Sequence, residues 1–186
     1  MNGGGGNLVG PSEAHTANKA RFGSSRYQAL VRTRLELNVT RKFDTPSDLK
    51  HNRGLVADPV AFAREAGAAS WLFLCGEEFA GMEGGISFAS VEAAVPHAAN
   101  VVSDPPRVMD MDLARRQISA LDALPRPTLV TCRTGPRSSA LVYLYAGLRS
   151  GASADEVLAR AEADDAPFTH AEDLKAWVLR GLDELA

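Results

Sequence analysis

The amino-acid sequence predicts a three-layer α/β/α fold around a mostly parallel sheet of about four or five strands. Strand-like apolar runs alternate with helical segments through most of the chain, which is the order expected for such a sheet. The run WLFLC at 71–75 is continuously apolar, as in a strand buried on both faces. The length of 186 residues suffices for one domain and an extension, but not for two ordinary domains.

Residues 1–30 are predicted to lie outside that domain. They open with MNGGGG and continue with polar residues in no period, so we expect a disordered arm. The excess of Arg and Lys over acidic residues also fits an organelle transit peptide, whereas the apolar segment of a secretory signal is missing. The alternating run LELNV at 35–39 predicts the first strand, so the domain is expected to span 35–186.

Capping residues predict the first helix of the domain. Asp58 is placed to cap it, Pro59 occupies its first position, and Gly67 stands just past its end. After the strand at 71–75, the segment 90–97 predicts a weaker helix that Pro96 stops. A short strand is expected at 100–102.

The second half of the chain predicts one strand among helices. The leucine and isoleucine spacing over 112–124 is helical, and Pro125 and Pro127 end that helix before the strand TLVTC at 128–132. A long helix is expected from Arg137 onward. Two capping boxes then predict two further helices, the second of which closes the chain: Ser153 with Glu156, and Thr169 with Glu172.

Composition narrows the choice of partners. Twenty basic and 23 acidic residues give a net charge of −3, so we expect neither nucleic acid nor an anionic membrane as a partner. No run approaches the ~20 apolar residues of a membrane span. Two cysteines and four scattered histidines form no disulfide framework and no metal-ligand spacing, so we expect no metal or cofactor. The sequence thus predicts a soluble intracellular protein, of the cytoplasm or an organelle interior, that is not secreted.

The stretch TCRTGPRS at 131–138 is the main candidate for a functional site. A tight turn between a strand and a helix makes backbone N–H groups converge near the positive end of the helix, which favours an anion. Cys132 is therefore the candidate nucleophile, because such a turn favours the anionic form of a thiol. Arg137 falls in the first helical turn, where its planar fork can bind two oxygens of a tetrahedral oxyanion.

Each other residue type in this loop suits an anion-binding role. Gly135 permits backbone angles closed to other residues, and Ser138 can donate a hydrogen bond toward the thiolate. Arg133 and Thr134 are expected to contribute N–H groups, whereas Pro136 has none to offer. The alternative is an inert buried cysteine at a strand end, but the complete pattern of strand, Cys, Gly, Arg, Ser and helix favours a functional loop.

CRTGPRS resembles the active-site loop of the cysteine phosphatase and rhodanese superfamily. It is most similar to the phosphatase-like domain related to beta-lactamase hydrolase-like proteins, in which four residues separate the Cys from an Arg-Ser pair. A weaker similarity extends over about 35–165. The resemblance implies a tyrosine phosphatase-like fold with Cys132 as nucleophile. Thr131 replaces the His of ordinary tyrosine phosphatases, and the short interval between Cys132 and Arg137 is similar to that of rhodaneses.

The resemblance also implies a general acid. Asp104 in VVSDPP follows a predicted strand end on a loop, where phosphatases of this superfamily keep the residue that protonates the leaving group. Asp110 and Asp112 are alternatives. Each of the three also has a purely structural interpretation, as a turn residue for Asp104 and as helix caps for the other two.

Cys75 ends a predicted strand as Cys132 does. In a parallel sheet the two thiols would emerge at the same edge, so Cys75 is a candidate redox partner, as in some redox-controlled phosphatases that this chain resembles. The alternative is a small buried hydrophobic residue.

The leading functional hypothesis is hydrolysis of a phosphomonoester through a cysteinyl-phosphate intermediate. The expected partner is a small anionic or phosphorylated substrate. A rhodanese-like sulfur transfer, with a persulfide on Cys132, is the first alternative. A catalytically silent module that senses an anion or an oxidant is the second.

Overall fold

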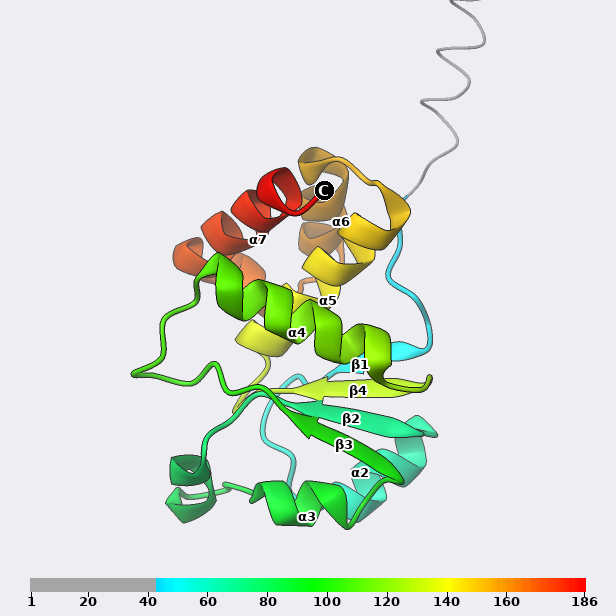
Figure 1. The fold of residues 1–186 in the computed structure, drawn as a ribbon, viewed down its shortest axis with the longest axis vertical. Helices are drawn as coiled ribbons and strands as arrows, with labels where there is room; N and C mark the ends of the chain where they lie inside the picture. Colours follow the sequence, from blue (N-terminus) through cyan, green and yellow to red (C-terminus); the bar gives the residue numbers. More distant parts are fainter. Residues whose placement is uncertain (1–42) are drawn as a thin grey trace, which may run out of the picture. The chain divides into compact units, whose positions relative to one another are not determined.

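A computed structural model describes residues 43–186, in which four parallel strands form one sheet. The predicted arm at 1–30 and the predicted strand at 35–39 lie outside the described residues. The strand order across the sheet is β1-β4-β2-β3, so β2 and β4 are the central strands (Figure 1). Their bounds are Leu49–His51 for β1, Ser70–Phe73 for β2, His97–Asn100 for β3 and Thr128–Thr131 for β4.

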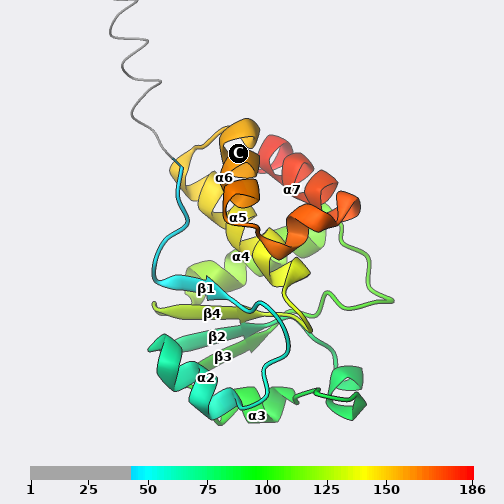
Figure 2. The same ribbon diagram turned by 180° about the vertical axis from the view of Figure 1, so that it is seen from behind.

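Helices cover both faces of the sheet. One group of helices packs on one face and a second group on the other, as the two views of the ribbon show (Figures 1 and 2). The alternating side chains of the central strands serve both layers, because Leu72 and Val130 join the core beneath the larger helical layer, whereas Trp71 joins the core of the smaller one. The predicted three-layer architecture is confirmed. The larger layer holds α4 (Met111–Ala123), α5 (Pro136–Ser150), α6 (Ala154–Ala163) and α7 (Glu172–Glu184), and the smaller holds α2 (Pro59–Ala66) and α3 (Phe88–Glu92).

Local capping signals place several helices where the sequence predicts them. The Asp58 side chain accepts a hydrogen bond from Ala61 N at the start of α2, and Gly67 ends that helix in the left-handed conformation at φ 62°. Ser153 and Glu156 form both bonds of a capping box at the start of α6. These termini depend on residues close in sequence, which is why sequence patterns locate them.

Two predicted segments are shifted along the chain. The helix expected at 90–97 is α3, Phe88–Glu92, because Ser87 caps it by accepting a hydrogen bond from Ser90 N. The strand expected at 100–102 is β3, whose register against β2 runs from Ser70 opposite His97 to Phe73 opposite Asn100. The partner strand, rather than the apolar run Val101-Val102, sets the position of β3.

The predicted capping box of Thr169 and Glu172 does not form. Thr169 lies in a 3₁₀ turn, Pro167–His170, where its hydroxyl donates to Ala166 O. Phe168 N donates to the Ser139 hydroxyl of α5, which anchors this turn against the neighbouring helix. The last helix therefore begins after Ala171 without a side-chain cap. A tertiary contact has overridden a local signal.

Within residues 43–186, none of the helices is both long enough and apolar enough to cross a bilayer.

Candidate active site at the end of strand β4

The cysteine loop connects the end of β4 to the start of α5, at the edge of the sheet where the parallel strands have their carboxyl ends (Figure 1). Gly135 precedes the helix with φ 116°, a conformation that favours glycine. A Cβ atom at this position would lie 2.5 Å from Asn52 O. The loop therefore needs glycine both for its backbone angle and for its close approach to the segment after β1.

The sulfur of Cys132 lies at the centre of this turn. Its side chain is only 3% exposed, and Gly135 N donates a hydrogen bond to Sγ at 3.2 Å. The start of α5 adds the positive end of a helix dipole on the same side. A backbone N–H and a helix N-terminus both stabilise negative charge, so the loop suits a thiolate.

Asn52, the first residue after the neighbouring strand β1, holds the loop, and sequence reasoning assigned it no role. Its amide nitrogen donates to Cys132 O at 2.9 Å, and its Oδ1 accepts from Cys132 N at 3.2 Å. The side chain is buried, so these bonds are made without competition from water. No local pattern marks Asn52, because its partners lie 80 residues further along the chain.

The hydroxyl of Ser138 takes a different direction from the predicted one. It lies 3.6 Å from the Cys132 sulfur but donates to Asn52 Oδ1 at 2.7 Å and also reaches Gly135 O at 3.0 Å. Because a hydroxyl has one proton, the short bond to Asn52 claims it. Ser138 therefore acts mainly on the loop conformation, and Gly135 N is the donor that faces the sulfur.

Arg137 is in the first turn of α5, as predicted. Its Nε is buried and has no hydrogen-bond partner among the described residues. Its Nη1 lies 3.7 Å from Asp104 Oδ1, the one ion pair that this arginine makes within residues 43–186. A guanidinium N–H without a partner, in the first turn of the helix that follows Cys132, is a donor that a bound oxyanion could satisfy.

Arg133 points its side chain away from the turn. Its Nε donates to Asp104 Oδ2 at 2.8 Å, and its Nη1 lies 2.9 Å from Met82 Sδ. The hydrogen bond to Asp104 is the main reason why the pKa of the Arg133 guanidinium is raised above its ordinary value. The guanidinium also stands 5.7 Å from the centre of the Phe79 ring, within the range of a cation–π contact.

The backbone of the loop is only partly engaged. Thr134 O accepts a hydrogen bond from Gly54 N at 2.9 Å, which ties the loop to the chain after β1. Within the described part of the chain, the N–H groups of Arg133 and Thr134 make no hydrogen bond to protein atoms. These two N–H groups are therefore free to donate to a bound anion, and their role as anion donors stays a prediction.

The three candidate acids lie in different surroundings. Asp104 is completely buried beside Arg133 and Arg137. Asp110 caps α4 by accepting from Leu113 N at 2.7 Å, and Asp112 is exposed and pairs with Arg115. Only Asp104 joins the arginines of the cysteine loop, so the helix-cap interpretation applies to Asp110.

The two cysteines face opposite layers. Cys132 belongs to the core beneath α5, whereas Cys75 belongs to the core beneath α2 and α3. Both are free and buried. Burial raises the pKa of the Cys75 thiol far above its usual range, and the nearby charges of Asp104 and Cys132 raise it further. The redox pairing of Cys75 with Cys132 stays a prediction.

Thr131, which stands where ordinary tyrosine phosphatases have a histidine, has a structural contact. Its hydroxyl oxygen accepts a hydrogen bond from Trp71 Nε1 at 2.8 Å, on the sheet face that carries Cys75. The side chain therefore points away from the Cys132 sulfur. Within residues 43–186, no group of three His, Cys, Asp or Glu side chains could hold a metal ion.

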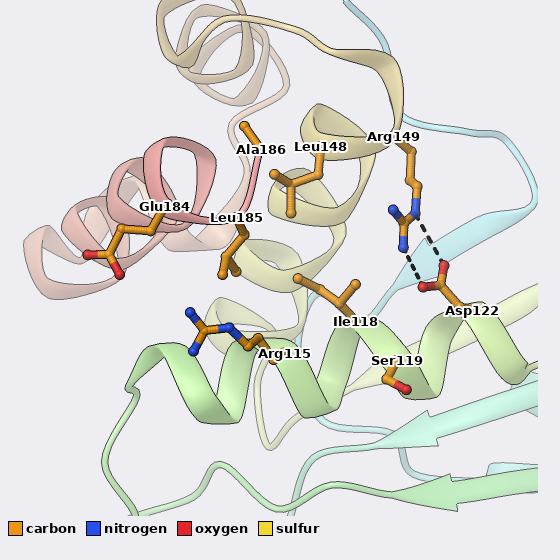
Figure 3. A pocket seen from close by; sticks show the side chains of 9 residues that line it. All are labelled: Arg115, Ile118, Ser119, Asp122, Leu148, Arg149, Glu184, Leu185 and Ala186. Carbon is orange, nitrogen blue, oxygen red and sulfur yellow. Dashed lines mark hydrogen bonds and ion pairs between the residues drawn. The ribbon is translucent and has the colours of Figure 1, made fainter.

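A cavity of about 350 Å³ opens at the far end of α5 (Figure 3). It lies roughly 20 Å along that helix from the cysteine loop, given a rise of about 1.5 Å per residue. Its wall includes Leu148 of α5 and Leu185 after α7, and Asp122 pairs with Arg149 across it. This cavity is therefore separate from the cysteine loop.

Comparison with known proteins supports the fold. No protein-family model and no curated protein matches the sequence. A phosphatase candidate from Neisseria meningitidis Z2491 aligns with 72% of this chain and 96% of its own, at 19% identity and a TM-score of 0.54. The catalytic core of the PP-IP phosphatase SIW14 from S. cerevisiae aligns over 70% of this chain and 78% of its own, at 14% identity and a TM-score of 0.49. TpbA from P. aeruginosa aligns over 72% and 83%, at 16% identity and a TM-score of 0.49. The described domain thus has the phosphatase-like α/β/α fold of the Neisseria protein, as the sequence predicts.

Proposed function

We propose that this protein is a cysteine-dependent phosphatase that hydrolyses a small phosphomonoester. The observation that carries the proposal is the pairing of two groups around one turn. The Cys132 sulfur accepts a hydrogen bond from Gly135 N, and the Arg137 Nε is buried without a partner among residues 43–186. A stabilised thiolate beside a free guanidinium edge suits attack on a phosphate. The fold shared with the Neisseria phosphatase candidate is in keeping with this chemistry.

The proposed reaction has two steps. The Cys132 thiolate attacks phosphorus in line, so that an S–P bond forms and the bond from phosphorus to the leaving oxygen breaks. Arg137 and the loop amides hold the equatorial oxygens, whose negative charge is the charge that must be stabilised. Water then attacks the cysteinyl phosphate, which releases orthophosphate and restores the thiolate. The electron pair of the broken bond stays with the leaving oxygen, and the predicted protonation of that oxygen by Asp104 is not a step of this mechanism.

Sulfur transfer is the second candidate, and the short interval between Cys132 and Arg137 favours it. In that reaction the thiolate attacks the outer sulfur of thiosulfate, a persulfide forms on Cys132, and sulfite leaves. A cyanide acceptor would then take the sulfur as thiocyanate. A catalytically silent sensing module, the third candidate, would bind an anion at the same site but would turn over no substrate.

Parallel assays separate these functions. Orthophosphate release from para-nitrophenyl phosphate and thiocyanate formation from thiosulfate and cyanide are measured on the same preparation of the full chain. The proposal expects the first product well above background and the second at background. Thiocyanate formation without phosphate release would contradict it in favour of sulfur transfer, and neither product would favour the silent module.

A further inference from the structure

Two arginines of the cysteine loop share one buried carboxylate. The Asp104 side chain is 0% exposed; its Oδ2 accepts a hydrogen bond from Arg133, whereas its Oδ1 is within ion-pair distance of Arg137 but accepts no hydrogen bond among the described residues. Arg133 Nε lies 2.8 Å from Oδ2, and Arg137 Nη1 lies 3.7 Å from Oδ1. Removing a carboxylate from water is costly, and the two cations are what compensate for that cost here. Asp104 thus lies in the buried part of the cysteine loop's surroundings and not at their solvent-exposed edge.

The position of Asp104 fixes which edge of Arg137 remains available. Nη1 is the guanidinium nitrogen on the same side as Cδ, whereas Nε and Nη2 form the opposite, fork-like edge. Asp104 pairs with Nη1, and Nε has no partner within residues 43–186. With the carboxylate near Nη1, the Nε edge is the one that remains for a tetrahedral oxyanion, which would take two parallel hydrogen bonds from it.

The rest of the contact network holds Asp104 in place. Arg133, which clamps the second carboxylate oxygen, is itself fixed by Met82 Sδ and stands over the Phe79 ring. The backbone on either side of Asp104 is also bonded. Ser103 N donates to Leu74 O, which extends the pairing beyond β2, and Arg107 N donates to Asp104 O in a turn. The carboxylate is thus positioned from both its side chain and its main chain.

The same geometry opposes a proton-donating role. A general acid must come within hydrogen-bond reach of the leaving oxygen. Asp104 has no exposed surface, its Oδ2 already accepts a hydrogen bond from Arg133, and a proton on Oδ1 would lie within 3.7 Å of the positive charge of Arg137. Cys75, whose thiol pKa is raised partly by the charge of Asp104, is the other titratable group beside it.

We propose that Asp104 is a positioning residue that orients the Arg137 guanidinium toward the oxyanion and supplies no proton to the leaving group. The proposal rests on the phosphatase function proposed above. It also defines the substrate class, because the oxygen that leaves phosphorus must then depart as a stable anion with the electrons of the broken bond. Aryl phosphates with electron-withdrawing substituents and phosphoric anhydrides meet that requirement, whereas phenyl phosphate and simple alkyl phosphates do not.

Binding of tungstate, an unreactive tetrahedral oxyanion, tests the positioning role without turnover. Asp104→Asn removes one negative charge beside the anion, so it would tighten tungstate binding if Asp104 did nothing for Arg137. Our inference expects the opposite, a loss of affinity of about tenfold, because the guanidinium loses its orientation. The control is Asp122→Asn, which removes a carboxylate from an arginine pair at the far end of α5 and should leave tungstate affinity unchanged. Unchanged or tighter binding by Asp104→Asn would overturn the inference.

Wild-type kinetics give a second test that does not depend on the folding of a variant. A positioned proton donor typically contributes about 10²–10⁴-fold for a poor leaving group. If Asp104 supplies no proton, kcat/KM for phenyl phosphate should be at least about a hundredfold below that for para-nitrophenyl phosphate, and equal values would overturn the inference. Tungstate binding without any turnover would contradict the proposed phosphatase function, while the affinity of Asp104→Asn would still decide the role of Asp104.

Discussion

The two ends of helix α5 each carry an arginine paired with an aspartate, yet the pairs differ in what they leave free. At the far end, Arg149 uses both Nε and Nη2 on Asp122, in an exposed pair beside the cavity of Figure 3. At the near end, Arg137 offers only Nη1 to Asp104, and its Nε has no partner in the described chain. The Nε and Nη2 of Arg149 are both bonded to a carboxylate of the same protein, whereas the Nε of Arg137 has no protein partner among residues 43–186.

The two aspartate–arginine pairs also differ in how far they are buried. Asp122 and Arg149 are each about half exposed, so water can form hydrogen bonds with any donor that the pair does not use. An exposed pair of this kind typically contributes roughly 0–1 kcal/mol to stability. Asp104 has no exposed surface, and the unpaired Nε beside it is out of contact with water. A buried donor without a partner is costly, and its place beside the Cys132 turn makes this one a candidate ligand contact.

The largest expected effect comes from removing the sulfur. Cys132→Ser should reduce turnover of para-nitrophenyl phosphate to background, because a serine hydroxyl is far less ionised than a thiol. The parallel change Cys75→Ser, in the other core, should leave initial rates within about twofold of wild type. Initial rates and thermal unfolding midpoints are measured for both variants. Substantial activity in folded Cys132→Ser would contradict the mechanism.

Exchanging the two arginines for lysine tests the comparison itself. Arg137→Lys should lower kcat by about 10²–10³-fold, the effect of losing one oxyanion donor, because an ammonium cannot form the fork. Arg149→Lys removes the same fork at the other end of α5 and should leave kcat unchanged. Steady-state kinetics on both variants measure the contrast. Similar rates in the two variants would show that Arg137 serves only as part of the helix.

Two asparagines offer a second matched pair, since each donates to the backbone carbonyl of one cysteine. Asn52 bonds Cys132 O, and Asn100 bonds Cys75 O. Asn52→Ala should lower the free energy of unfolding by about 1–3 kcal/mol, the cost of leaving buried polar groups unsatisfied. It should also lower turnover, because the loop that carries the sulfur loses its anchor. Asn100→Ala should affect stability without lowering turnover, which denaturant unfolding and initial rates together can verify.

The glycines that flank α5 offer a third matched pair. Gly135→Ala and Gly151→Ala both place a side chain at positive φ, which costs roughly 1–2 kcal/mol. The added Cβ meets Asn52 O at Gly135 but nothing within 4 Å at Gly151. Gly135→Ala should therefore be the more destabilising of the two and the only one to reduce turnover. Equal unfolding free energies for the two variants would argue against the tight approach of the loop to Asn52.

The sequence predicts the parts of this site whose signals are local. Cys132, Gly135 and Arg137 are close together in the chain, and the strand before them and the helix after them define the turn. Asn52 escaped prediction because its short strand β1 has only three residues and its partners are distant. The link of Asp104 to Arg133 spans 29 residues and depends on how the loop after β3 folds back. The exact position of β3 likewise depends on its pairing with β2.

The mass of the Cys132 peptide after acid quench tests most directly whether Cys132 is the nucleophile of a phosphoryl transfer. The full chain is mixed with para-nitrophenyl phosphate or with thiosulfate, quenched during turnover, and digested. Cys75→Ser is treated in the same way, so that Cys132 is its single thiol. The account predicts a phosphoryl group on the peptide that contains Cys132, in both proteins, and no sulfur adduct from thiosulfate. An unmodified Cys132 throughout measurable phosphate release, or a persulfide as the only adduct, would contradict it.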